Sequence, residues 1–371
     1  MKITFFIIAF SIFLLINSYV IARGWQALSS STTFRTEYIV AMILLFITLI
    51  ISMIFGNEFP INNAKPMSFI GFTYIIIFSY LFISFFVVDI IRLANYFIHF
   101  LPAGMAGFRL WTMYLTLTVT AISLIVGNYN FNRPKVVTLN LSSDKARQNK
   151  EIKIVAVSDI HLGISIGKEN LKRYVKLIND QHPDIVLLAG DISDRLVEPI
   201  IRQNMVEEFR SIKAPLGVFA INGNHEHYAE EPDATAKYLQ KAGIVVLRDE
   251  VVCVDSSFYV VGREDRSNSK RKSLKQIING SNLNIPFILM DHQPFQLEEA
   301  ERNNIDFQIS GHTHNGQFFP GNLLVKNMYE LAYGYLKKGE THYYVSSGLG
   351  LWGPQYRIGT QSELVVINFK F

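Results

Sequence analysis

Residues 185–194 decide the fold of this chain, and they read Ile-Val-Leu-Leu-Ala-Gly-Asp-Ile-Ser-Asp. The five apolar residues predict a short buried strand, and Gly190 and Asp191 follow at the point where that strand ends. A carboxylate has two oxygen atoms, so one side chain can bind two divalent cations at once. We therefore predict that Asp191 bridges two metal ions. The simpler alternative is a solvated turn, because glycine and aspartate are common in loops.

The same arrangement recurs throughout residues 151–371. Apolar runs typical of strands alternate with helical patterns, which predicts a layered α/β domain with buried parallel strands. Polar side chains follow five of the predicted strands, which are 152–157, 185–189, 216–221, 286–290 and 307–310. Sites form in the crevice beyond the carboxyl ends of such strands, so we expect these side chains to converge.

The converging set contains two carboxylates, one carboxamide and four imidazoles. Its members are Asp159, His161, Asp191, Asn224, His292, His312 and His314. Oxygen and nitrogen ligands without sulfur suit Mn, Fe, Zn or Co. With Asp191 shared, they form two sets of four ligands, and each metal ion keeps room for water. The one cysteine, Cys253, excludes an internal disulfide and is expected to pack as a small apolar residue in a strand.

Five motifs carry a resemblance to a known family. They are Asp159-Ile160-His161, Gly190-Asp191-Ile192-Ser193-Asp194, Gly223-Asn224-His225-Glu226, His292 and Gly311-His312-Thr313-His314. In this order they resemble the motifs of the calcineurin-like metallophosphoesterase superfamily, over residues 151–371. Gln317 and the segment 346–354 resemble the bacterial membrane-associated YkuE-like branch of that superfamily. The resemblance implies a β-sandwich flanked by helices, with four α/β/β/α layers.

The resemblance also implies a role for each motif residue. One metal ion would take Asp159, His161, Asp191 and His314, and the other would take Asp191, Asn224, His292 and His312. Manganese is the first expectation for both ions. The two cations would activate a water molecule for in-line attack on phosphorus. His225 is implied as the residue that protonates or stabilises the leaving oxygen, and Asp194 as the carboxylate that orients His225.

The first 130 residues are expected to form a membrane domain. Four apolar stretches occupy residues 3–22, 38–55, 69–88 and 108–127. Each approaches the roughly 20 residues that cross a bilayer as a helix, which predicts four transmembrane helices. The first stretch has a cleaved signal peptide as its alternative interpretation. Residues 131–150 are expected to be a polar linker with a short strand at 136–141, followed by the catalytic domain at 151–371.

Charges around these stretches predict the side of the membrane. Four basic residues crowd the exit of the last stretch, namely Arg133, Lys135, Lys145 and Arg147. Because basic residues mark the cytoplasmic side, we expect an integral protein of the inner or plasma membrane with a cytoplasmic catalytic domain. Four other basic residues oppose this topology: Arg23, Arg35, Arg92 and Arg109. The formal charge of +4 is too mild to predict nucleic-acid binding.

Together these features predict a membrane-anchored phosphoesterase that hydrolyses a phosphodiester or pyrophosphate bond with two divalent metal ions. A lipid-linked substrate, such as the UDP-linked acylated sugars of related enzymes, is the leading hypothesis. The alternatives are a soluble phosphodiester, with the membrane part only as an anchor, and a non-catalytic membrane receptor or scaffold. An apolar insertion at 318–329 is either core or a lid for an acyl chain. A phosphoprotein substrate is not expected, because Asp194-Arg195-Leu196 departs from the Asp-Arg-Gly sequence of the protein serine/threonine phosphatases.

Overall fold

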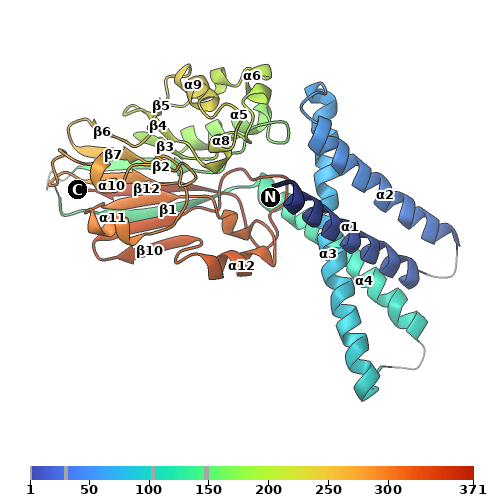
Figure 1. Ribbon diagram of the computed structural model, residues 1–371. Coiled ribbons are helices and arrows are strands. Elements are labelled where there is room, and N and C mark those ends of the chain that lie inside the picture. The colour runs from blue at the N-terminus through green and yellow to red at the C-terminus, as the bar shows by residue number, and fades with distance from the viewer. Residues whose placement is uncertain (1, 29–31, 102–104, 146–149) are drawn as a thin grey trace. The chain divides into compact units, whose positions relative to one another are not determined.

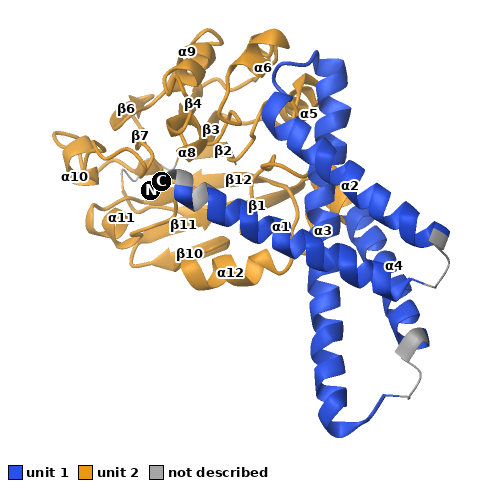
Figure 2. Ribbon diagram, turned by 45° about the vertical axis from the view of Figure 1, so that its right-hand side comes forward, with its two compact units in different colours: residues 1–126 blue, residues 127–371 orange. Residues whose placement is uncertain are grey.

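The structure is a computed structural model that describes residues 2–28, 32–101, 105–145 and 150–371 (Figure 1). Arg147, one of the basic residues on which the predicted topology depends, lies outside the described residues. The chain divides into two compact units, residues 1–126 and 127–371 (Figure 2). The boundary falls inside a helix, α4 (Met105–Asn132), so the end of this helix belongs to the second unit.

The first unit consists of apolar helices. They are α1 (Lys2–Ala27), α2 (Thr32–Phe55), α3 (Ile61–Ile98) and the greater part of α4. All four are long and apolar enough to cross a membrane, with mean hydropathy between 1.7 and 2.8. The four predicted transmembrane stretches are therefore present as helices of the required length and composition.

A polar cluster joins α1 to α3 within this unit. Asp89 of α3 accepts a hydrogen bond from Tyr19 at 2.7 Å and forms ion pairs with Arg23 at 2.8 Å and with Arg92 at 3.1 Å. Because each charge has an opposite partner, the cost of placing these groups among apolar helices is reduced. Asp89 thus ties two helices together.

Two six-stranded sheets form the second unit. The first sheet has the order β1 (Lys135–Ser142), β12 (Glu363–Lys370), β2 (Glu151–Val157), β3 (Ile185–Ala189), β4 (Val218–Ile221) and β5 (Val245–Val246). The second has the order β10 (Gly334–Lys338), β11 (Thr341–Val345), β9 (Phe307–Ser310), β8 (Phe287–Met290), β7 (Phe258–Gly262) and β6 (Glu250–Val254). Strands β2 to β5 are parallel, as are β7, β8, β9 and β11. The prediction of parallel strands is confirmed.

Helices cover the outer face of each sheet (Figure 1). The first sheet carries α5 (Lys168–Asn179), α6 (Glu198–Arg202), α7 (Val206–Arg210) and α9 (Ala234–Gln240), and the second carries α10 (Leu274–Ile277) and α11 (Glu298–Arg302). In β3, Val186 and Leu188 pack beneath the helices, whereas Ile185 and Leu187 pack against the second sheet. Both faces of β3 are buried, which explains its unbroken apolar sequence. The predicted four-layer α/β/β/α fold is confirmed.

The end of α4 and the segment after it are built into the second unit. Phe131 is buried in the core under the helices of the first sheet. The side chain of Asn130 donates to the backbone carbonyl of Arg357 at 3.1 Å, and the backbone nitrogen of Arg357 donates to the carbonyl of Gly127 at 2.8 Å. The short strand expected at 136–141 is present as β1, which pairs in parallel with β12 along its whole length. This segment therefore forms the edge of a sheet.

Local details of the second unit differ from the sequence expectations. The helix expected within 197–211 is two short helices, α6 and α7, because Asn204 between them has a φ of 48° and cannot continue an α-helix. The helix α12 (Gly321–Met328) and the strand β10 were not predicted. Cys253 lies in β6, but its side chain is exposed, so the prediction that it packs in the interior is wrong.

Candidate metal centre

The predicted ligands lie where five parallel strands end. Asp159 and His161 follow β2, Asp191 follows β3, and Asn224 follows β4. His292 follows β8, and His312 and His314 follow β9. Asn224 also opens a short helix, α8 (Asn224–His227). Strands β2, β3 and β4 run parallel in one sheet, and β8 and β9 run parallel in the other. The carboxyl ends of both sets bring residues up to 155 positions apart into one site.

Asp159, His161 and His314 form one ligand group. Their ligand atoms all lie within 4.8 Å of one another. The Nε2 atoms of His161 and His314 are 3.2 Å apart, and Nε2 of His314 is 3.5 Å from Oδ1 of Asp159. Asp159 and His161 are fully buried. Two ring nitrogens and one carboxylate oxygen thus face a common point.

Asp191, His292 and His312 form a second group with the same spacing. Oδ2 of Asp191 is 3.1 Å from Nε2 of His292. Asn224 joins this group, because its Oδ1 lies 2.7 Å from Nδ1 of His312. Nδ1 of His292 lies 2.8 Å from the backbone oxygen of Ala189, which fixes the ring with Nε2 toward Asp191.

Asp191 lies between the two groups. The same Oδ2 atom that faces His292 is 3.7 Å from Nε2 of His161, a member of the first group. Burial alone would raise the pKa of Asp191, but the positive charge of His292 beside it holds that pKa well below its usual range. An ionised carboxylate in this position fits the predicted bridging role.

The residues present fit two divalent cations. The Nε2 atoms of His161 and His314 face each other at 3.2 Å. Nε2 of His292, which has no hydrogen-bond partner within the described part of the chain, faces Oδ2 of Asp191 at 3.1 Å. Burial lowers the pKa of His161 to about 3 and that of His314 well below its usual value, so both rings are neutral and offer lone pairs. Neutral imidazoles opposite carboxylates, without sulfur, suit first-row divalent metals.

The backbone of the site adopts an uncommon conformation. Five of the seven predicted ligands have a φ between 50° and 70°, namely Asp159, His161, Asp191, His312 and His314. Residues other than glycine seldom adopt this region, and such strain concentrates at functional sites. The motif glycines make room for the carboxylates. A Cβ atom at Gly223 would overlap the carboxylate of Asp191, and a Cβ atom at Gly311 would overlap the carboxylate of Asp159. Close packing therefore explains why Gly precedes Asn224 and His312.

His225 and Asp194, predicted to handle the leaving group, are also brought together. Nδ1 of His225 lies 3.1 Å from Oδ1 of Asp194. Burial opposes protonation of the ring, but the hydrogen bond to Asp194 and the charge of Asp191 raise the pKa of His225 above its usual value. The ligand atoms of His225, His161 and Asp191 also lie within 4.8 Å of one another. The geometry therefore admits His225 as an acid and as a metal ligand.

Glu226 supports the site in a way that the sequence did not reveal. Its buried carboxylate accepts hydrogen bonds from the backbone nitrogens of Asp191 at 3.1 Å, Ser193 at 2.7 Å and Gly223 at 2.8 Å. It thereby joins the loop after β3 to the loop after β4. The only sequence signal was its position directly after Asn224 and His225 in a motif.

Arg357 and Trp352 were also missed as site residues. Arg357 is fully buried, and its guanidinium donates to the backbone oxygens of His314 at 2.9 Å, of Gly348 at 3.2 Å and of Gly350. Burial lowers the pKa of Arg357 to about 10, so the side chain is charged at neutral pH. Trp352 is 52% exposed, and its ring centroid lies 6.5 Å from that of His225.

Several known proteins are similar to this chain. Residues 152–316 match the family described as calcineurin-like phosphoesterase. A zebrafish (Danio rerio) protein named as a transmembrane protein with metallophosphoesterase domain is 30% identical over 69% of this chain and 62% of its own length. An uncharacterized metallophosphoesterase of Helicobacter pylori is 32% identical over 64% of each chain, and one of Campylobacter jejuni is 31% identical over 69% of each chain. The match thus spans less than two thirds of the first two relatives.

Proposed function

Because this chain belongs to the calcineurin-like metallophosphoesterase family, we propose that it is a membrane-anchored hydrolase that cleaves a phosphodiester or pyrophosphate bond with two divalent metal ions. One observation carries the proposal: Oδ2 of Asp191 faces His292 of one ligand group at 3.1 Å and His161 of the other at 3.7 Å. The four apolar helices that precede the phosphoesterase fold support the membrane anchor.

The seven ligands divide as the two groups suggest. We assign Asp159, His161, His314 and Asp191 to one ion, and Asp191, His292, His312 and Asn224 to the other. Two divalent cations bound there would polarise the phosphoryl oxygens and lower the pKa of an attacking water molecule. Manganese is the ion we propose first, with Fe, Zn and Co as alternatives, because all the ligand atoms are oxygen or nitrogen.

His225 is proposed as the general acid. The raised pKa of its imidazole favours the protonated form that a leaving oxygen requires. Asp194, 3.1 Å from Nδ1, would orient the ring and stabilise its charge. The exposed indole of Trp352, beside His225, would provide an apolar surface for the leaving group.

The substrate is proposed to be lipid-linked, and the insertion at 318–329 supports this. None of the residues of α12 is buried, so the alternative that this insertion is core finds no support. Leu324 and Met328 are each 66% exposed, and Leu323 is exposed as well. A run of exposed apolar side chains, closely following His314 in the sequence, suits contact with an acyl chain. A UDP-linked acylated sugar is the specific candidate.

The catalytic unit is proposed to lie in the cytoplasm, next to the inner or plasma membrane. The argument rests on the basic residues after α4, of which Arg133, Lys135 and Lys145 are described. A reporter enzyme fused to the C-terminus tests this. We expect a reporter that is active only in the cytoplasm to be active in the fusion. Activity of a reporter that works only in the periplasm would contradict the proposed location.

The activity itself is tested with the full chain in detergent. The protein, loaded with Mn, is incubated with bis(p-nitrophenyl) phosphate, p-nitrophenyl phosphate and a UDP-linked acylated sugar. We expect metal-dependent hydrolysis of bis(p-nitrophenyl) phosphate, a diester, and of the pyrophosphate bond in the UDP-linked sugar. Little hydrolysis of the monoester, p-nitrophenyl phosphate, is expected. Hydrolysis of the soluble diester alone would favour an enzyme that is merely anchored to the membrane. No hydrolysis with both ions bound would favour a receptor or scaffold.

A further inference from the structure

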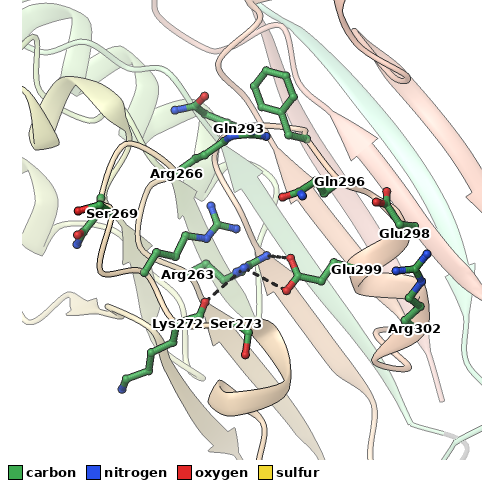
Figure 3. A pocket seen from close by; sticks show the side chains of 13 residues that line it. Arg263, Arg266, Ser269, Lys272, Ser273, Gln293, Gln296, Glu298, Glu299 and Arg302 are labelled. Carbon is green, nitrogen blue, oxygen red and sulfur yellow. Dashed lines mark hydrogen bonds and ion pairs between the residues drawn. The ribbon is translucent and has the colours of Figure 1, made fainter.

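Figure 3 shows a basic cavity whose lining includes Gln293, the residue that follows the proposed ligand His292. It has a volume of about 550 Å³ and lies between the segment 263–273, which follows β7, and the segment 293–302, which follows His292. Five cationic side chains and two carboxylates line it. None of the proposed metal ligands lines this cavity, so the proposed metal centre does not account for it.

The base of the cavity is a fixed network of charges. The side chain of Arg263 is only 7% exposed, and its guanidinium is held by Glu299 at 2.8 Å (Figure 3). Asp291 holds the same guanidinium at 3.1 Å. Arg271 pairs with the same carboxylate of Asp291. Nε of Arg263 has no hydrogen-bond partner in the described part of the chain. Oδ1 of Asp291 likewise has no partner there. The two guanidiniums at the base thus face two carboxylates, and their charges balance.

The rim of the cavity carries further positive charge. Arg266, Lys272 and Arg302 line it, and within the ranges that the structure describes none of them has an ion-pair partner. The guanidinium of Arg266 lies 4.3 Å from the ring centroid of Phe295. This stacking holds a long side chain in place without neutralising its charge.

The loop that presents these cations is itself held in place. Asp265 accepts hydrogen bonds from the side chain of Gln293 at 2.9 Å and from the backbone nitrogen of Ser267 at 2.8 Å. Asp249 accepts from the backbone nitrogens of Glu264 at 2.9 Å and Lys272 at 2.8 Å. A solvated basic loop needs no such anchoring, whereas a binding site gains affinity from it because less order is lost on binding.

A pair of aromatic rings connects the cavity with the metal ligands. The ring centroid of Phe295 lies 4.8 Å from that of Tyr329, which in turn lies 6.3 Å from the centroid of His312. Burial raises the pKa of the Tyr329 phenol, and the nearby charge of Arg266 offsets part of that rise. A ligand that reaches from the metal centre across these rings would place its far end among the cations.

We infer that this cavity binds a second phosphate group of the substrate, on the part of the molecule beyond the phosphorus that is hydrolysed. Guanidinium and ammonium groups are suited to phosphate oxygens. The inference rests on the proposed phosphoesterase activity, and it specifies that the substrate carries a second anionic group. A phospholipid headgroup has the same chemistry, so the experiment separates the two sources.

The test compares two diesters that differ in one phosphate. Thymidine 5′-(p-nitrophenyl phosphate) and its 3′-phosphorylated form are hydrolysed by the full chain in detergent with Mn. The wild-type protein should prefer the phosphorylated form in kcat/KM, mainly through KM. Arg266→Gln should reduce that preference about tenfold, as expected for a lost charge-assisted hydrogen bond. Arg266→Lys, which keeps the charge, should restore part of it.

Lys275→Gln provides the matched control, because Lys275 is an exposed cation on α10 that does not line the cavity. Lys275→Gln should leave the preference for the phosphorylated diester unchanged. If Lys275→Gln and Arg266→Gln reduced that preference equally, the effect would come from the overall charge of the protein, and the inference would be overturned. An unchanged preference in Arg266→Gln, together with lost stimulation by phosphatidylglycerol micelles, would assign the cavity to lipid headgroups and also overturn it.

Failure of the proposed activity is recognised separately. If the wild-type protein hydrolyses neither diester, equilibrium binding of thymidine 3′,5′-bisphosphate and thymidine 5′-monophosphate decides the inference without turnover. Tighter binding of the bisphosphate, lost in Arg266→Gln and kept in Lys275→Gln, supports the cavity as a phosphate site. Equal binding of the two nucleotides to the wild-type protein would overturn it.

Discussion

Nδ1 of His225 and Oδ1 of Asp194 lie 3.1 Å apart, although Asp194 lies in the loop after β3 and His225 in α8, which follows β4. Hydrogen bonds from the backbone anchor both segments. The nitrogen of His225 donates to Asp191 at 2.9 Å, and the nitrogen of Asp194 donates to the carbonyl of Leu162 at 2.9 Å. The carboxylate therefore holds the imidazole in one orientation and favours its charged form, as an acid catalyst requires.

Replacement of His225 separates an acid from a metal ligand. His225→Ala should keep both metal ions and lose about 10²- to 10⁴-fold in kcat, the usual contribution of general acid catalysis. The loss should shrink for a diester whose leaving group is p-nitrophenol, because that oxygen needs no proton. Elemental analysis and a series of leaving groups check this. Loss of one metal ion, or an equal rate loss for all leaving groups, would assign His225 to the metal site.

Replacement of Asp194 should change the pH dependence. Asp194→Asn removes a carboxylate that raises the pKa of His225, so that pKa should fall toward its usual value or below it. An acid acts only while protonated, so activity should be lost at a lower pH than in the wild-type protein. The alkaline limb of the kcat/KM profile, measured with an alkyl diester, should shift to lower pH. A limb that does not move would argue against this pair.

The bridging role of Asp191 is tested by metal content. Asp191→Ala should abolish activity and lower the bound metal below two ions per chain, because both groups lose a ligand. Circular dichroism checks that the fold is kept, and Asp191→Asn provides a variant that preserves the shape of the side chain. Two tightly bound metal ions in both Asp191→Ala and Asp191→Asn would show that Asp191 does not bridge them.

Exposed leucines on α12 test the lipid-linked substrate. A Leu323→Ser and Leu324→Ser double variant should weaken turnover of a long-chain acylated substrate much more than that of bis(p-nitrophenyl) phosphate. The reason is that each CH₂ group removed from water is worth about 0.8 kcal/mol. Leu283→Ser is the matched control, since Leu283 is similarly exposed but precedes β8, whereas the ligands follow it. Equal losses for both substrates, with a lowered Tm, would show that α12 is structural.

The strands, and the positions of the proposed ligands at their ends, were predictable because their signals are local. The apolar run at 185–189 is continuous since both of its faces are buried, and Asp191 follows it directly. The same rule placed His292 and His312 at the ends of their strands. Parallel strands then bring these ends together whatever the distance between them in the sequence.

Other features depend on contacts that no local pattern records. Glu226 and Arg357 bind mainly backbone groups, which every residue has, so their partners leave no trace in the sequence. The helix α12 is only eight residues long, and helices of this length depend on their surroundings more than on propensity. The cations of the basic cavity come from segments that only the fold brings together.

The incorporation of the α4 terminus limits how the catalytic unit can be isolated. A fragment starting at residue 151 would lack β1 and leave β12 as an open edge, which invites aggregation. It would also lack Phe131 and the carbonyl of Gly127 that accepts from Arg357, whose side chain holds the carbonyl of His314. A soluble version of this enzyme should therefore begin no later than Gly127, even though it then carries the last turns of a membrane helix.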